Sequence, residues 1–216
     1  MIRVYKSPNA PASLTETKAC DGDDVNRQLL DDQHGKCYIC ERCRDTDFEV
    51  EHLACRGNAP ELAHEWNNLY MACDYCNKKK STSFDNILRP SEVNIEDEIE
   101  QRLDISNKKA LFLSHADDAQ HHETVRLLER VFNGTNTMRT VREERFFEQV
   151  LSVVNRFNGV LIEYINNPGA ETEQAVRDEL SMDSELLGFK YWIIRSNPEF
   201  YATFSDAMAW NKPVMP

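Results

Sequence analysis

The 216-residue sequence lacks long hydrophobic runs, contains only 7 Gly and 8 Pro, and has fewer basic than acidic side chains. No apolar stretch approaches the ~18 residues that a membrane-spanning helix needs. No apolar region follows the positive charges of the opening MIRVYKSPNAP, so nothing in it indicates export. Internal repeats and low-complexity tracts are also missing. With 41% hydrophobic residues, we expect a soluble chain with one large or two small domains.

Positive charge is scarce. The chain has 25 Lys and Arg against 37 Asp and Glu, a formal net charge of −12. This argues against a protein that binds nucleic acid unaided, because Lys and Arg supply most non-specific affinity for phosphates. The imbalance is smaller between residues 36 and 80, where seven basic side chains meet eight acidic ones.

Four of the seven cysteines form two C-x-x-C pairs with 32 residues between them. The pairs are Cys37 with Cys40 and Cys73 with Cys76. Two thiolates of such a pair can bind one tetrahedral ion, so two turns of this kind brought together make a closed four-sulfur site. The spacing predicts a structural Zn²⁺ bound by all four cysteines.

The remaining cysteines are Cys20, Cys43 and Cys55, which make the total odd. An odd number, with four residues in metal spacing, fits a reducing cytosol better than a disulfide scaffold. We therefore expect a cytoplasmic protein. All three are interpreted as ordinary thiols, although Cys43 is close enough to Cys40 to compete for the ion.

Polar residues suited to catalysis lie between and beside the cysteine pairs. Glu51 and His52 follow the segment FEV, and Asn68 lies within WNNL. Asn77 comes directly after the last cysteine, nine residues beyond Asn68. Together with the cysteine pairs, this arrangement resembles the HNH endonuclease motif of the ββα-metal fold.

The resemblance implies a role for each of these residues. Glu51 and Asn77 would hold a catalytic Mg²⁺ or Mn²⁺ through hard oxygen ligands. His52 would be the general base that deprotonates the attacking water. Asn68 would brace the loop that orients this base. One position departs from the family pattern: many HNH motifs have proline where this chain has Cys55.

The lysines after Asn77 are candidates for binding the scissile phosphate. Lys78 and Lys80 would act as point charges. A solvated helix face explains the same lysines equally well.

The flanking motifs narrow the resemblance further. The opening with Lys6 and Pro11, the C-x-x-C-E pair and the W-x-N-L-x-x-x-C-x-x-C-N-x-x-K segment are similar to HNH endonucleases of the PtuB type, which act in bacterial Septu antiphage systems. Related proteins accompany some retrons. The resemblance is strong over residues 36–81 and much weaker over the remainder. It implies a hetero-oligomer with a Septu-type, PtuA-like ATPase, whose basic surface would supply the missing affinity for nucleic acid.

The pattern of apolar residues predicts an α+β fold. Strands are expected at about residues 48–52 and 69–71, followed by a helix at 74–83, which is the ββα order. Strict alternation places His52 on the strand face opposite Glu51. Later segments predict a hairpin within residues 102–114 and helices over 124–132, 141–165, 171–187 and an aromatic-rich segment 188–209 split at Asn197 and Pro198.

These elements suggest four regions. Residues 1–35 would pack on the nuclease module of residues 36–84, a ββα-metal (HNH) module with a four-cysteine zinc knuckle. Residues 85–115 would form a linker with a possible hairpin, and residues 116–216 a mainly helical domain. Apolar stripes of this last domain could dock the ATPase or pack internally; they comprise residues 141–165 with Phe189, Tyr191, Trp192, Phe200 and Tyr201.

Two rival functions use the same cysteines. A zinc knuckle could bind nucleic acid or protein without catalysis, with Glu51 and His52 as surface residues. Alternatively, the ion could be a redox or iron–sulfur centre. The zinc-knuckle interpretation leaves the joint placement of four residues unexplained, namely Glu51, His52, Asn68 and Asn77. No further cofactor motif supports a redox or iron–sulfur centre. The sequence does not distinguish DNA from RNA.

Overall fold

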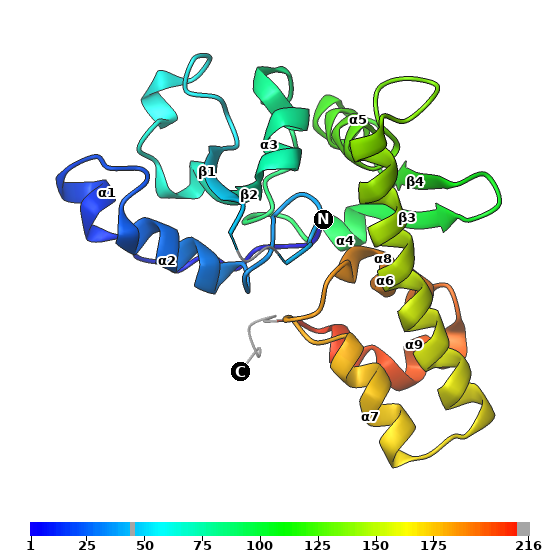
Figure 1. The fold of residues 1–216 in the computed structure, drawn as a ribbon. Coiled ribbons are helices and arrows are strands. Elements are labelled where there is room, and N and C mark those ends of the chain that lie inside the picture. The colour runs from blue at the N-terminus through cyan, green and yellow to red at the C-terminus, as the bar shows by residue number, and fades with distance from the viewer. Residues whose placement is uncertain (44–45, 211–216) are drawn as a thin grey trace.

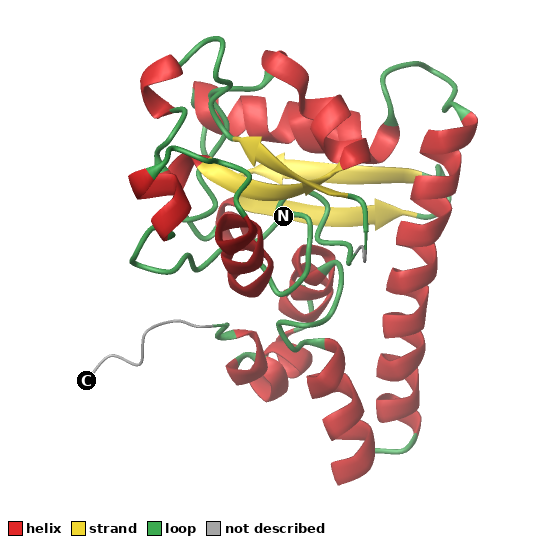
Figure 2. Cartoon of the chain, turned by 60° about the vertical axis from the view of Figure 1, so that its left-hand side comes forward, coloured by secondary structure: helices red, strands yellow, loops and turns green. Residues whose placement is uncertain are grey.

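The computed structural model describes residues 1–43 and 46–210 (Figure 1). Within these residues the strands form two antiparallel hairpins, β1 (Phe48–His52) with β2 (Leu69–Cys73) and β3 (Ile99–Asp104) with β4 (Lys109–Ser114). Both hairpins lie near the middle of the molecule, with helices around them (Figure 2). The α-helices are α1 (Ala12–Glu16), α2 (Asp23–Asp32), α3 (Asp74–Lys80), α4 (Ile95–Glu98), α5 (Ala119–Asn133), α6 (Val141–Asn166), α7 (Ala170–Glu179), α8 (Leu187–Arg195) and α9 (Pro198–Phe204). Short 3₁₀ turns occupy Pro60–Leu62, Trp66–Asn68, Ser81–Ser83 and Asp206–Met208.

The first hairpin and α3 form a ββα unit. Because side chains alternate along a strand, Glu49 and Glu51 share one face of β1, and each accepts a hydrogen bond from an α3 side chain. The opposite face carries Phe48 and Val50, which pack against a small core from the N-terminal helices and the first hairpin. The buried members of that core are Leu14, Val25, Leu29, Trp66, Leu69 and Met71.

The helices after the second hairpin begin at sequence-encoded caps. Asp118 accepts hydrogen bonds from the backbone at the start of α5. Thr140 and Glu143 form a reciprocal capping box at the start of α6, which satisfies backbone N–H groups that have no partner within the helix. Asn197 caps α9, so the aromatic segment divides where the sequence predicts.

One helix ends earlier than expected. The apolar pattern predicts a helix over residues 171–187, but α7 ends at Glu179 and α8 begins only at Leu187. Between them the backbone carbonyls of Met182 and Ser184 accept hydrogen bonds from the Lys36 ammonium. This contact with a distant part of the chain replaces helical hydrogen bonding.

Most side chains of the apolar stripes form internal cores, which is one of the two alternatives that the sequence leaves open. Phe189, Tyr191 and Trp192 are at most 7% exposed. The α6 stripe is buried in the same way, through Phe147, Val150, Val154, Phe157 and Leu161. Tyr201 is the exception among the aromatic candidates, at 42% exposed.

The largest core contains buried residues from Met1 to Phe189. It joins residues of the cysteine-containing module, the second hairpin and α5, α6 and α8. One core therefore crosses all the boundaries between the four regions that the sequence suggests. The division into these regions remains a prediction. The α+β class with a helical C-terminal region is confirmed. Among the described helices, none combines the length and apolarity required for crossing a membrane.

Candidate active site and metal centre

The two C-x-x-C pairs converge on one point. The sulfur atoms of Cys37, Cys40, Cys73 and Cys76 all lie within 4.8 Å of one another, and all four residues are buried. Cys40 Sγ and Cys73 Sγ are 3.9 Å apart. A tetrahedral zinc ion with Zn–S bonds of about 2.3 Å requires sulfur–sulfur separations of about 3.8 Å. The four-cysteine cluster thus fits a structural zinc site.

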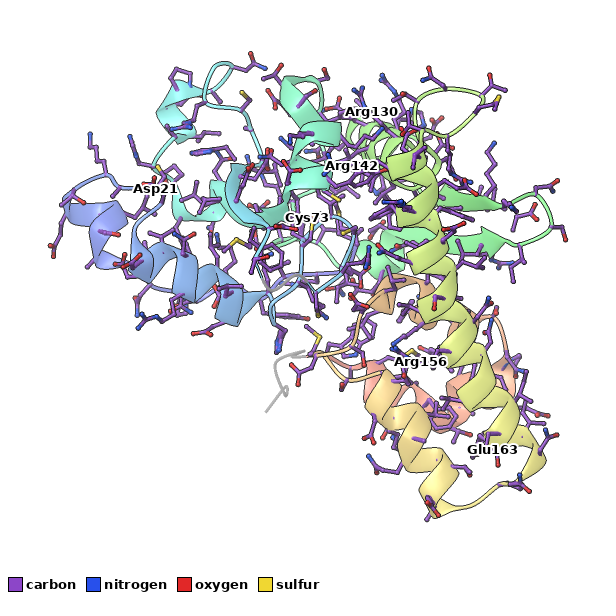
Figure 3. All side chains as sticks on the ribbon, in the orientation of Figure 1. Asp21, Cys73, Arg130, Arg142, Arg156 and Glu163 are labelled. Atoms are coloured by element: carbon purple, nitrogen blue, oxygen red, sulfur yellow. The ribbon has the colours of Figure 1, made fainter. Side chains whose placement is uncertain are left out.

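Local backbone geometry places each pair. Cys37 and Cys40 lie on a tight turn in which the Glu41 N–H donates to the Cys37 carbonyl at 2.8 Å. Glu41 has a positive φ of 58°, a conformation that L-residues rarely adopt. Its buried carboxylate accepts from the Gly188 N–H, which helps to hold this turn. Cys73 ends β2 (Figure 3). Cys76 lies in the first turn of α3.

The other cysteines lie outside the cluster. Cys20 is near the first 3₁₀ segment, where its sulfur is 3.2 Å from His64 Nδ1 and 3.1 Å from the Ala63 carbonyl oxygen. Burial raises the pKa of the Cys20 thiol above its ordinary value, which keeps the thiol protonated. These contacts do not resemble a metal site.

His52 is oriented by the loop between β1 and β2. Its Nε2 atom lies 2.9 Å from the Ala63 carbonyl oxygen. Because a carbonyl oxygen only accepts hydrogen bonds, Nε2 carries the proton and Nδ1 is the proton-accepting nitrogen. Burial lowers the pKa of His52 below its ordinary value, which favours the neutral imidazole. This is the state that a general base requires.

Asn68 closes the loop that contains Ala63. Its side-chain oxygen accepts from the Ala54 N–H at 2.8 Å, and its amide nitrogen donates to the carbonyls of Ala54 and Leu62 at 3.0 Å. Asn68 is only 1% exposed. The side chain therefore fixes both ends of the loop, in agreement with the bracing role that the HNH resemblance implies.

Glu51 faces α3 and is held by a buried cation. Lys80 Nζ lies 2.8 Å from Glu51 Oε1 and 3.0 Å from the His52 carbonyl oxygen, with Asp85 Oδ1 3.8 Å away. Tyr38 donates to the second Glu51 oxygen at 2.9 Å. Burial raises the pKa of the Glu51 carboxyl, while the Lys80 ammonium opposes this shift.

Asn77 has a different partner on the same interface. Its side-chain nitrogen donates to Glu49 Oε2 at 2.5 Å. Asn77 and Lys80 are three positions apart, so they share one face of α3. The structure thus brings Asn77 and Glu51 to the same strand–helix interface but bonds each to another residue. Glu49 and Asp85 were not identified from the sequence, although Glu49 was detectable as the residue two positions before Glu51. Lys80 was predicted to bind the scissile phosphate, whereas here it pairs with Glu51.

The donor groups at this interface suit a hard divalent cation. Glu51 and Asn77 offer carboxylate and amide oxygens, the ligand types that Mg²⁺ and Mn²⁺ prefer. The Lys80 ammonium is bonded to Glu51 Oε1. A metal ion that binds this oxygen would have to replace Lys80.

The lysines after Asn77 have unequal surroundings. Lys80 has a fully buried side chain, whereas the Lys78 side chain is 68% exposed and pairs with Asp74. In this conformation only Lys78, of the two phosphate-binding candidates, can reach a nucleic acid at the surface.

Replacing Lys80 by methionine should destabilise the protein by about 3–5 kcal/mol, because loss of one partner leaves a buried charge uncompensated. Urea unfolding measures this difference. Lys78→Met is the matched control, with an expected cost below about 1 kcal/mol for an exposed pair. Equal effects of the two substitutions would show that the Lys80–Glu51 pair is not a structural element.

Comparison with known proteins agrees with this geometry. The HNH endonuclease family model matches residues 40–83, which contain the ββα unit and three of the four clustered cysteines. Cys37 lies just before the matched segment. No curated protein matches the chain. The HNH domain expected from the sequence is confirmed, and the domain occupies less than half of the chain.

Proposed function

We propose that the HNH domain at residues 40–83 makes this protein a metal-dependent endonuclease that hydrolyses phosphodiester bonds of nucleic acid. The observation that carries the proposal is the setting of His52. Its Nε2 proton is fixed by the Ala63 carbonyl, Asn68 closes the loop around that carbonyl, and burial favours the neutral ring. A neutral histidine held in one tautomer suits general-base catalysis.

His52 would take a proton from the attacking water at Nδ1. Asn68 would act through the loop, by keeping the imidazole ring in one orientation. Glu51 and Asn77 would hold Mg²⁺ or Mn²⁺, which supplies stabilisation of negative charge on the phosphate and the leaving oxygen. Zn²⁺ at the cysteine cluster would have a separate, structural role, because thiolates are soft ligands and the cluster has no open position.

Asn77→Ala should weaken Mn²⁺ binding by at least about tenfold, by analogy with losses in other metal sites, while zinc content stays unchanged. Titration calorimetry measures Mn²⁺ affinity, and elemental analysis measures zinc. Asn67→Ala, at the exposed position before Asn68, is the control that should alter neither. Loss of both metals in the Asn77 variant would mean that the two sites are not independent.

We further propose, from the resemblance to the PtuB type, that the protein acts in the bacterial cytoplasm as the nuclease of a Septu-type antiphage system, together with a PtuA-like ATPase. The net charge of −12 supports a partner that helps to hold nucleic acid. The proposal is tested by purifying the chain with its operon neighbour and measuring mass and cleavage. A monomer that cuts rapidly at physiological salt and gains nothing from the neighbour would refute the partnership.

A further inference from the structure

The side of α3 away from β1 lines a basic pocket. Lys78 and Lys79 of α3, Arg130 of α5 and Arg142 of α6 surround a surface pocket of about 320 Å³. Arg130 and Arg142 lie where α5 and α6 approach α3 (Figure 3). These cations come from segments far apart in the sequence, so the fold assembles the pocket and no local charge run predicts it. We call it the α3–α5–α6 pocket.

A second pocket adjoins the first. It has a volume of about 410 Å³, shares Tyr75 and Arg142 with the α3–α5–α6 pocket, and adds Arg145 and Gln149 of α6. Five basic and three acidic side chains line the two pockets. This balance is opposite to that of the whole chain, in which acidic residues outnumber basic ones by 37 to 25.

Part of this positive charge is unpaired. Among the residues that the structure describes, no carboxylate lies within ion-pair distance of Arg130 or Arg145. Arg130 Nε has no hydrogen-bond partner in the described chain, and the guanidinium lies over the Phe84 ring. Lys78 and Arg142 share one carboxylate, that of Asp74. The pockets therefore keep capacity to bind anions.

We propose that the α3–α5–α6 pocket and its neighbour bind the phosphodiester backbone of the nucleic acid beside the bond that is cut. The inference rests on the proposed nuclease function and names the surface of this chain that holds its substrate. Guanidinium groups bind phosphate oxygens through paired hydrogen bonds, and lysines add point charges. Cations spread over two adjoining pockets match a repeating anion better than a single phosphate group.

The position of the pocket relative to the active site supports this assignment. Asn77 faces β1, and the next two residues, Lys78 and Lys79, line the pocket. A helix with its side chains is about 10–12 Å across, so a strand that crosses α3 passes from the basic pocket to the catalytic residues within a few nucleotides. The helical region outside the matched HNH segment thus contributes to substrate binding through Arg130, Arg142 and Arg145.

Binding of labelled oligonucleotides tests the proposal. Fluorescence anisotropy is measured in the His52→Ala protein without added divalent metal, so the result does not depend on cleavage. The probes are single- and double-stranded DNA and RNA of one sequence. The double substitution Arg130→Glu with Arg142→Glu should raise Kd by at least about tenfold. The slope of log Kd against log salt concentration should fall by the equivalent of roughly two phosphate contacts.

A control of equal charge separates the pocket from the general charge of the protein. Arg102→Glu with Lys108→Glu alters exposed residues of the second hairpin, whose side chains are 54% and 71% exposed. This pair should change Kd by less than about threefold, because distant exposed charges are screened by salt. If the glutamate variant of the pocket fails to fold, Arg130→Gln with Arg142→Gln provides the same comparison with a smaller expected loss.

Equal weakening by the pocket and hairpin variants would overturn the proposal. It would also be overturned if no oligonucleotide binds the chain, either alone or together with its operon neighbour, or if anionic phospholipid vesicles bind and oligonucleotides do not. Failure of the nuclease proposal has a different signature, namely normal pocket-dependent binding with no cleavage by the wild-type protein.

Discussion

His52→Ala is expected to lower the rate of nucleic-acid cleavage by about 10²–10⁴-fold, the range typical of a lost general base. The physical reason is the geometry of His52, whose Nε2 is occupied by the Ala63 carbonyl and whose Nδ1 is the proton-accepting nitrogen. The ring does not contact the cysteine cluster, so zinc content should be unchanged. Single-turnover cleavage and elemental analysis of the same preparation measure both quantities.

His64→Ala provides the matched control. His64 is exposed on the same loop, and its ring contacts Cys20. Its loss should leave the cleavage rate within about threefold of wild type, because surface substitutions away from functional contacts have small effects. Cleavage by His52→Ala within tenfold of wild type would contradict the assignment and require another base.

Cys76→Ser should release the zinc ion and unfold the HNH domain. Structural zinc sites have apparent binding free energies of about 10–16 kcal/mol, comparable to the whole stability of a typical domain, about 5–15 kcal/mol. The unfolding should extend to α5 and α6, because the cluster belongs to the large core that these helices share. Zinc content and thermal unfolding followed by circular dichroism measure the effect, and Cys37→Ser should behave in the same way.

Cys55→Ser is the corresponding control. Cys55 is partly exposed and lies outside the four-sulfur cluster, so this variant should keep its zinc and its melting temperature. Retention of one tightly bound zinc ion per chain by Cys76→Ser would rule out coordination by all four cysteines.

Features encoded locally were predictable from the sequence. The C-x-x-C spacing predicted the cluster because the two cysteines of each pair are close in sequence. Only the convergence of the two pairs depends on the fold. Alternation predicted β1 and the opposite directions of Glu51 and His52, which the structure retains. The capping residues of α5, α6 and α9 act within a few positions of themselves, so helix starts were also recognisable.

Features that depend on distant contacts were not predictable. The burial of Lys80 depends on its packing against β1, and its sequence, three lysines in a row, suggested a solvated face. The early end of α7 reflects hydrogen bonds from Lys36, about 146 positions away. The basic pocket was not predictable either, because Arg130 and Arg142 come close to α3 only in the folded chain.

The most direct measurement of the central claim is cleavage by the wild-type protein with and without divalent ions while zinc remains bound. Protein washed with a weak chelator, and shown to retain one zinc ion per chain, is assayed on DNA and RNA, alone and with its operon neighbour. The account predicts no cleavage until Mg²⁺ or Mn²⁺ is added, and cleavage in their presence. Cleavage that does not require added ions, or no cleavage of any substrate under all of these conditions, would contradict it and favour a zinc knuckle that binds without catalysis.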